Sequence, residues 1–202
     1  MGNIQNSPYL LQKVLFIQKY SQKAHVTHSS ISSSSISVCL PNLCDTEFGI
    51  ESKDLSDLMR STTEFVIEDG VLKYSFESTV GDKMAKICKK IELISLNYTF
   101  EFENPILTAK VPIFKCISID NTFIIFSKNK LLLQTSGYVK TRNVLDAQRV
   151  DGVDCFEICV SGKDLKIVEE LGTDLVLCCY QNCIVVFSFE NDISTAVVVR
   201  NV

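Results

Sequence analysis

The sequence predicts an α+β protein made of two similar units, and three observations lead to this prediction. The chain has 202 residues, which is enough for two domains of common size. Its apolar content of 46% is too high for a disordered chain. Short alternating stretches typical of strands are interspersed with a few helical patterns, and this order of elements occurs twice.

The first element is predicted to be an amphipathic helix over residues 8–23. The stretch PYLLQKVLFIQKYSQK places apolar residues at helical spacing opposite Lys13, Lys19 and Lys23. Ser7 and Pro8 favour a helix start, because a capping hydroxyl precedes a proline at the first helical position. We therefore expect a helix with a cationic face, followed by strands near 25–29 and 36–40.

An internal repeat follows this helix. Residues Phe48–Leu55 recur as Phe156–Leu165, with the Lys-Asp-Leu triplet displaced by 110 positions. Residues Tyr74–Ser78 are echoed by Phe187–Asn191, a displacement of 113 positions. Each copy predicts a strand ending in a serine that caps a short helix, then a strand and its hairpin partner. Two echoes in the same order favour duplication over chance.

The expected elements of the two copies can be placed by residue number. The short helices cover 53–61 and 163–171, and the strands that follow are 65–68 with 71–77 and 175–180 with 184–190. The turn Glu68-Asp69-Gly70 predicts the first hairpin. Ahead of the second copy, 112–117 predicts a short helix that precedes strands 122–126 and 131–135, which are joined by a polar turn at 127–130.

A connector is expected between the two halves. Residues 89–110 begin as a strand, become acidic and aromatic, and are interrupted by Pro105. We therefore assign 1–92 to an N-terminal domain, 93–110 to the connector and 111–202 to a C-terminal domain.

Composition and motifs exclude several classes of protein. The net charge of −4 argues against DNA binding by phosphate neutralisation over the whole surface, although a local basic face stays open. Nine cysteines, an odd number, with no secretory signal argue against a disulfide framework. No two cysteines are separated by two residues, the spacing that places two thiolates on one zinc, and the only histidines are His25 and His28. We therefore expect most cysteines to fill the core and expect no metal.

Membrane and enzyme functions are not expected either. The apolar stretches are too short or too interrupted for a membrane span, and no signal peptide is recognisable. No dinucleotide-binding glycine motif, phosphate-binding loop or nucleophile elbow occurs. We therefore expect no enzyme activity and no cofactor.

A two-fold repeat of helix, strands, helix and strands with an extended connector resembles the sliding-clamp superfamily. This superfamily includes the proliferating-cell nuclear antigen and the three related subunits of the DNA-damage checkpoint clamp, the nine-one-one complex. Residues 87–112 look like the passage through the interdomain connecting loop, and 156–202 look like the closing segment. The resemblance implies two clamp-type domains, with antiparallel sheets outside and helices inside.

Within this superfamily, two features resemble the checkpoint subunits. Residues 140–145, KTRNVL, are followed by a short acidic spacer, and the strand 195–199 is not followed by the acidic tail typical of the replicative clamp. The resemblance implies a nuclear subunit that acts with related subunits in a hetero- or homotrimer, is placed on DNA by an ATP-driven loader and recruits repair or checkpoint proteins. A replicative clamp that serves as a polymerase processivity factor is one alternative. A β-rich protein-interaction module unrelated to DNA is the other.

The resemblance also implies that the helices line a pore around duplex DNA and carry its cations. The candidate DNA-facing residues are Lys13, Lys19, Lys23, Lys53, Arg60, Lys115, Lys163 and Lys166. Each of them is equally consistent with an ordinary solvated cation, and Glu169 and Glu170 share the last helix with two of them.

Two further surfaces follow from the resemblance. The family closes its ring by pairing edge strands of neighbouring subunits, and we expect these edges around 65–77 and 175–189. The connector would flank an apolar pocket that receives short partner motifs, with Leu96, Tyr98, Phe100, Phe102 and Ile106 as its candidate residues. Alternatively, these side chains pack a strand onto its own sheet.

Overall fold

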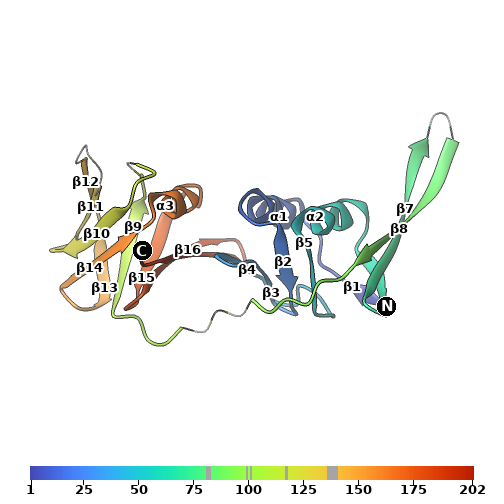
Figure 1. Ribbon diagram of the computed structural model, residues 1–202, viewed down its shortest axis with the longest axis horizontal. Coiled ribbons are helices and arrows are strands. Elements are labelled where there is room, and N and C mark those ends of the chain that lie inside the picture. The colour runs from blue at the N-terminus through green and yellow to red at the C-terminus, as the bar shows by residue number, and fades with distance from the viewer. Residues whose placement is uncertain (81–82, 99, 101, 117, 136–140) are drawn as a thin grey trace. The chain divides into compact units, whose positions relative to one another are not determined.

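The computed structural model describes residues 1–80, 83–98, 100, 102–116, 118–135 and 141–202 (Figure 1). It divides into two compact units, Met1–Thr99 and Phe100–Val202. The division lies within residues 93–110, where the sequence predicts the connector. Every strand pair within either unit is antiparallel, and helices accompany the sheets, which confirms the predicted α+β class.

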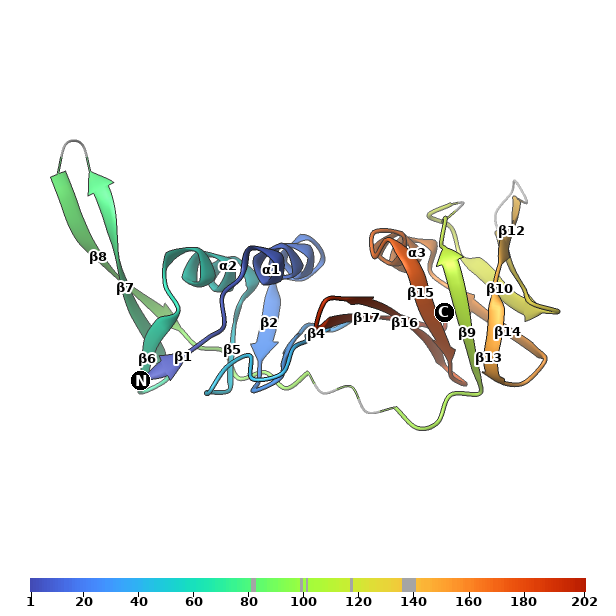
Figure 2. The same cartoon turned by 180° about the vertical axis from the view of Figure 1, so that it is seen from behind.

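The first unit combines a helical layer with strands, and its helices are α1 (Pro8–Tyr20) and α2 (Ser52–Ser61). Its strands are β1 (Gly2–Asn3), β2 (Lys23–Val26), β3 (Ser30–Ser32), β4 (Ile36–Cys39), β5 (Phe48–Glu51), β6 (Glu64–Glu68), β7 (Val71–Val80) and β8 (Lys83–Glu92). Strands β4, β3, β2 and β5 pair in that order, and a separate sheet has the order β1-β6-β7-β8. The two helices lie side by side on one face of the β2–β5 strands (Figures 1 and 2).

Burial of one face of each helix holds this layer on the strands. Leu10, Val14 and Ile17 of α1 are fully buried, as are Leu55 and Leu58 of α2. These residues recur at the spacing of one helical face, so each helix covers the strands with an apolar stripe and turns its polar residues outward.

The start of α1 is as predicted, but its end is not. The Ser7 Oγ accepts a hydrogen bond from the Leu10 N–H at 3.0 Å, and Pro8 occupies the first turn. The helix ends at Tyr20 because Ser21 is extended and its hydroxyl donates to the Lys23 carbonyl at 2.9 Å. The prediction that Lys23 lies on the helix is therefore wrong, since Lys23 opens strand β2.

The predicted serine cap is wrong for α2 and is confirmed only in position for α3. Ser52 lies inside the first turn of α2, and Glu51 is the N-cap residue without a side-chain cap hydrogen bond. The Ser52 Oγ is buried and has no hydrogen-bond partner among the described residues. Ser161 does occupy the N-cap of α3, but its side chain makes no capping hydrogen bond.

The predicted hairpin turns are confirmed. Asp69 and Gly70 have left-handed φ angles of 49° and 74°, and Glu68 pairs with Val71 around them. Lys128 and Asn129 have φ angles of 51° and 59° in the turn after Ser127. Successive left-handed residues match the twist of the flanking strands, which explains why these short loops join adjacent antiparallel strands.

The second unit has one helix among its described residues, α3 (Gly162–Glu169). Its strands are β9 (Leu107–Ile113), β10 (Thr122–Ser127), β11 (Lys130–Thr135), β12 (Arg142–Asp146), β13 (Gln148–Gly152), β14 (Cys155–Val160), β15 (Thr173–Cys179), β16 (Cys183–Glu190) and β17 (Ile193–Arg200). Strands β13, β9, β15, β16 and β17 pair in that order, and β12-β11-β10-β14 form a second sheet.

The helix predicted over 112–117 is absent from the described part of that segment. Pro112 and Ile113 close β9, where Ile113 pairs with Thr173 of β15. Phe114 is buried at 2% exposure, and Lys115 and Cys116 follow without helical structure. Pairing of Ile113 with β15 thus places the start of the predicted helix in a strand.

The repeated order of elements is present in both units. In the first, β5, α2, β6 and β7 follow one another, and in the second β14, α3, β15 and β16 do so. A third strand then completes each meander, β8 in one case and β17 in the other. The front halves differ, because α1 has no counterpart among the described residues of the second unit.

The predicted edge strands are wrong. Residues 65–77 belong to β6 and β7, which are interior in the order β1-β6-β7-β8. Residues 175–189 belong to β15 and β16, which are also paired on both sides. The ends of the two four-stranded sheets are β1 and β8 in the first unit and β12 and β14 in the second.

The capping geometry gives a matched pair of serine substitutions. Ser7→Ala removes a hydrogen bond to a helix N-terminus and should lower the free energy of unfolding by about 0.5–2 kcal/mol. Ser52→Ala removes a buried hydroxyl without a partner among the described residues and should leave stability unchanged or raise it. Urea denaturation of both variants measures the difference, and an equal loss from both would contradict the assignment of the caps.

Candidate nucleic-acid face and connector site

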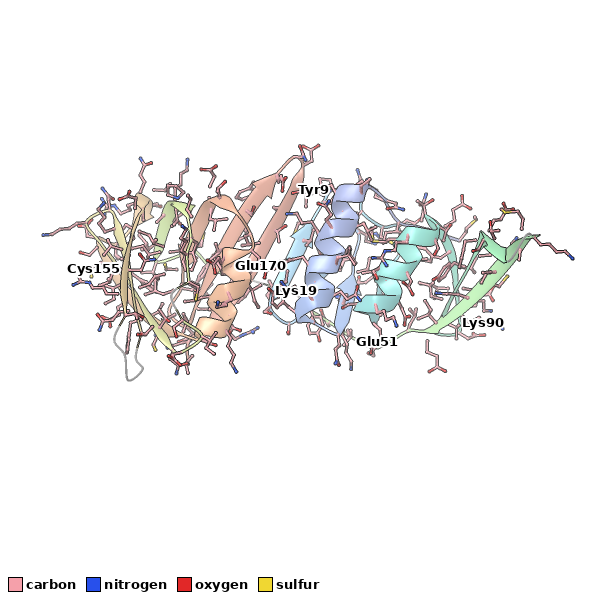
Figure 3. All side chains as sticks on the ribbon, turned by 90° about the horizontal axis from the view of Figure 1, so that it is seen from above. Tyr9, Lys19, Glu51, Lys90, Cys155 and Glu170 are labelled. Atoms are coloured by element: carbon pink, nitrogen blue, oxygen red, sulfur yellow. The ribbon has the colours of Figure 1, made fainter. Side chains whose placement is uncertain are left out.

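Helix α1 carries cations and no acidic residue. Lys13 is partly buried with its Nζ over the Tyr9 ring, 4.9 Å from the centroid, and the Lys19 Nζ lies 5.2 Å from the Tyr20 centroid. Figure 3 shows α1 beside α2 from above and labels Tyr9 and Lys19. These positions lie off the fully buried stripe of Leu10, Val14 and Ile17. Periodicity therefore predicted the charged side of this helix.

Helix α2 adds Lys53 and Arg60, which are both exposed. The same helix carries Asp54 and Asp57, so its formal charge is balanced. The Asp57 carboxylate accepts from the Lys89 Nζ of β8 at 3.4 Å. The structure thus brings together four predicted cations on the two adjacent helices of the first unit: Lys13, Lys19, Lys53 and Arg60.

Helix α3 presents a weaker positive face. Lys163 and Lys166 are exposed, but Glu169 ends the helix and Glu170 is its exposed C-cap. Asp164 lies in the first turn, where burial raises the pKa of its carboxyl although Arg200 acts in the opposite direction. The helix therefore carries equal numbers of acidic and basic residues.

Two predicted cations lie away from the helices. Lys23 is the exposed first residue of β2, and Lys115 lies in the loop after β9. The Lys115 carbonyl accepts from the Asn143 Nδ2 at 3.4 Å. Their prediction as helical cations is wrong because both helices that would carry them are shorter or absent in the described residues.

Sequence reasoning missed a basic edge strand. Strand β8 carries Lys83, Lys86, Lys89 and Lys90 and pairs only with β7 among the described residues. The register places Lys73 opposite Lys90 and Glu77 opposite Lys86. The close spacing of the lysines in KMAKICKKIE was visible, but only the strand order shows that they lie at a sheet edge.

The connector begins along the first unit. The Ile94 N–H donates to the Gly49 carbonyl at 2.9 Å, and the Tyr98 N–H donates to the His25 Nδ1 at 3.4 Å. His25 is 3% exposed, and its Nε2 lies 2.9 Å from the Glu47 Oε1. These partners fit a neutral imidazole that accepts at Nδ1 and donates at Nε2.

The connector then packs on the second unit. Phe100 contacts a cluster of Val185, Ala196 and Val198. Phe102 stacks on Phe100 with centroids 6.1 Å apart, and on Tyr180 with centroids 5.1 Å apart. The Ile106 N–H donates to the Cys179 carbonyl at 2.8 Å, and the Ile106 side chain is 39% exposed.

The five predicted pocket residues are therefore divided between the units. Leu96 and Tyr98 belong to the first unit, and Phe100, Phe102 and Ile106 belong to the second.

Sequence reasoning missed a surface pocket of about 570 Å³ in the second unit. Its lining comes from several separated segments, including Lys110, Asn129, Asp146 and Asp174, so no local signal could have indicated it.

The cysteines are free, and their burial differs from the prediction. Cys44 and Cys179 are buried, and burial raises the pKa of the Cys179 thiol to about 12, so it stays protonated. Cys39, Cys88 and Cys155 are exposed, and the prediction that most cysteines fill the core is wrong for these three.

The described residues contain no group of three or more potential metal ligands. None of the described helices has the length and apolarity needed to cross a membrane.

The fold is that of DNA sliding clamps. The proliferating cellular nuclear antigen of Entamoeba histolytica has a TM-score of 0.67 and 12% identity, and the match covers 100% of this chain and 98% of that one. The DNA polymerase III subunit beta of Pseudomonas aeruginosa has a TM-score of 0.69 and 11% identity, and the match covers 100% of this chain. The Helicobacter pylori beta clamp, solved bound to a DNA ligase peptide, has a TM-score of 0.64 and 10% identity, with 99% of this chain covered.

This chain spans about two thirds of the bacterial beta clamps, 65% and 66% of their lengths. The sequence matches no protein-family profile. It matches no curated protein either.

The Gly49–Ile94 contact that holds the connector gives a test of its position. A Cβ at Gly49 would lie 2.2 Å from the Ile94 carbonyl oxygen, so Gly49→Ala should displace residues 93–96. Hydrogen–deuterium exchange of this segment should become faster, while Ser95→Ala, at an exposed position in the same segment, should leave it unchanged. Unchanged exchange in Gly49→Ala would show that the connector is held elsewhere.

Proposed function

We propose that this chain is a non-enzymatic subunit of a ring-shaped clamp that encircles duplex DNA. The observation that carries the proposal is the clamp fold over the whole chain, together with a helical layer whose first helix bears lysines and no acidic residue. A β-rich interaction module would have no need for cations gathered on adjacent helices.

Encirclement reconciles DNA binding with an acidic protein. The chain has a net charge of −4, which disfavours association with DNA over its whole surface. A closed ring prevents dissociation by topology, so it requires only a modest positive field where the duplex passes. Phosphate contacts of this kind carry no sequence information, which suits a clamp that slides.

The proposed DNA-facing residues are Lys13, Lys19, Lys53 and Arg60 in the first unit and Lys163 and Lys166 in the second. Lys23 and Lys115 would contribute from a strand and a loop rather than from helices. The contribution is collective, because a single exposed cation adds little in water. Helix α1 should dominate, since the other two helices balance their cations with carboxylates.

Ring closure would use the ends of the four-stranded sheets, β8 and β12. Each has another strand on one side only among the described residues, and an unpaired edge accepts a strand from another chain.

The proposed partners are related clamp subunits, an ATP-driven loader, and repair or checkpoint proteins that dock beside the connector. The proposed location is the nucleus.

The finer proposal is a checkpoint subunit in a heterotrimer. It is supported by the resemblance of residues 140–145 to the checkpoint subunits; the first of these, residue 140, lies outside the described residues. The alternative is a replicative clamp that assembles from identical chains, and it is favoured by the match over 98% of a nuclear antigen chain.

Charge reversal tests the DNA face. The variant Lys13→Glu/Lys19→Glu/Arg60→Glu should bind a short duplex at least about ten-fold more weakly at low salt and should reduce the salt dependence by about three counterions. Lys110→Glu/Lys128→Glu/Arg149→Glu makes the same charge change at exposed positions outside the helices and outside the two strands proposed for ring closure, and it should retain most of the affinity. Fluorescence anisotropy measures both, and circular dichroism verifies folding.

Two outcomes of this experiment would contradict the proposal. If both variants lose equal affinity, only net charge matters. If neither loses any, the helices do not contact DNA.

The mass of the purified chain in solution distinguishes the two kinds of clamp. A heterotrimer subunit should have a mass near 22.6 kDa by light scattering at micromolar concentration, because its edge strands pair with different subunits and not with a second copy of this chain. A stable assembly of three identical chains would contradict the checkpoint proposal and support the replicative one.

A further inference from the structure

His25 of β2 is a buried histidine whose two ring nitrogens have different partners. Its side chain is 3% exposed. The Tyr98 N–H of the connector donates to the His25 Nδ1 at 3.4 Å, and the Nε2 lies 2.9 Å from the Glu47 Oε1. A backbone N–H can only donate, so Nδ1 carries the lone pair and Nε2 carries the hydrogen. The contact with the connector therefore requires the neutral Nε2–H form of this ring.

The connector reaches His25 along one face of the first unit. His25 pairs directly with Gly49 of β5, so both positions face the same side of the strands. The Ile94 N–H donates to the Gly49 carbonyl at 2.9 Å, and the Leu96 Cβ lies 3.0 Å from the position that a Cβ at Gly49 would have. Residues 94–98 thus run over this pair, and the amides of Ile94 and Tyr98 anchor the two ends of the contact.

Three charged residues share this face with His25. Glu47 contacts the ring at Nε2. Lys23 lies two positions before His25 on β2, and the register places it opposite Glu51 of β5. These two opposite charges are cross-strand neighbours, and both side chains are exposed. The charge that acts directly on the ring is therefore that of Glu47.

The other elements packed against His25 bring no charge to it. Ser32 of β3 pairs with His25, and its hydroxyl is bonded to that of Ser37 at 2.8 Å. The helix layer packs on the opposite face of β2, to which the fully buried Ala24 and Val26 belong. Among the described residues, the hydrogen-bond partner of Nδ1 is the connector amide.

We propose that His25 is a proton-operated latch for the connector, in which the neutral ring holds Tyr98 and protonation at Nδ1 releases it. An imidazolium carries a hydrogen on both nitrogens, so Nδ1 then points a donor at the Tyr98 N–H. Glu47 keeps its bond to Nε2 in both states and offsets the charge of the protonated ring. The response is therefore a local opening at Tyr98 and not unfolding of the unit. This latch goes beyond the proposed clamp function and does not depend on it.

The direction of the pH effect follows from the number of bound protons. The closed contact excludes a proton from the His25 Nδ1, and opening allows this nitrogen to bind one. An imidazole in water takes up its second proton near pH 6.5, so lowering the pH through about this value favours the open form and raising it favours the closed form. Opening moves the last anchor on the first unit from Tyr98 back to Ile94. The free connector thereby gains four residues, about 13 Å of extended chain.

Amide exchange with water tests the latch without DNA. Exchange of single amides is measured by NMR at about pH 7.5 and about pH 5.5 and corrected for its intrinsic pH dependence. The Tyr98 amide should lose about five-fold of its protection at the lower pH, as expected for the loss of one neutral hydrogen bond. The Leu93 and Ile94 amides donate to the Gly70 and Gly49 carbonyls and should keep their protection. Ring nitrogen chemical shifts should show the Nε2–H form at the higher pH.

Two histidine variants separate the latch from a general effect of pH. His25→Asn places a carbonyl oxygen near the position of Nδ1, and this oxygen accepts at both pH values, so protection of Tyr98 should no longer depend on pH. His28→Asn is the matched control, because the His28 Nδ1 lies 2.9 Å from the Cys44 carbonyl and not at the connector. This control should retain the pH effect of the unaltered chain.

Glu47→Gln tests the role of the carboxylate. The amide still offers an acceptor to the His25 Nε2 but lacks the charge that stabilises the imidazolium. The opening of Tyr98 should therefore move to a pH at least about half a unit lower. Thermal melting of each variant verifies folding.

An Nδ1–H ring at the higher pH would overturn the proposal, as would protection of Tyr98 that does not fall at the lower pH. Equal loss of protection at Tyr98 and Ile94 would show a general opening of the unit. A pH effect in His25→Asn as large as in the unaltered chain would show that another group is responsible. If His25→Asn does not fold, Glu47→Gln decides, because an unshifted opening contradicts the latch.

Discussion

The strict alternation of side chains along the strands is the constraint on which the rest of the fold depends. In β16 and β17 it sends Ile184, Val186, Val197 and Val199 to one side and Val185 and Val198 to the other, and all of them are buried. A sheet that is apolar on both faces needs other segments to pack on each face and exclude water. The helix layer covers one of them, and the connector contributes to the cover of the other, so a segment without secondary structure becomes part of the fold.

Local signals in the sequence were sufficient for much of this architecture. The serine and proline at the start of α1, the Asp-Gly turn after β6 and the repeated strand–helix–strand order each depend on neighbouring residues, and the structure contains all three. One prediction failed where pairing with a distant strand decided the outcome. Ile113 pairs with Thr173 of β15, so the apolar run that was expected to form a helix begins inside strand β9.

In the candidate site, too, features set by a single element were predictable, and features set by contacts between distant elements were not. Helical periodicity placed Lys13, Lys19 and Arg60 outside the buried stripes, because that inference needs only one element. Strand order and the contacts of Phe100 and Phe102 could not be predicted in this way. They depend on which strands occupy the sheet ends and on which side chains of β16 and β17 meet the connector, and both are properties of the assembled unit.

The lysines of β8 have a consequence for the protein before it meets any partner. Lys83, Lys86 and Lys90 are exposed along a strand that ends its sheet among the described residues, where uncharged side chains would favour pairing of one chain with another into fibrils. Repulsion between like-charged edges keeps the strand solvated while it is alone. These charges therefore oppose pairing of one β8 edge with another, and they favour an acidic strand as its pairing partner.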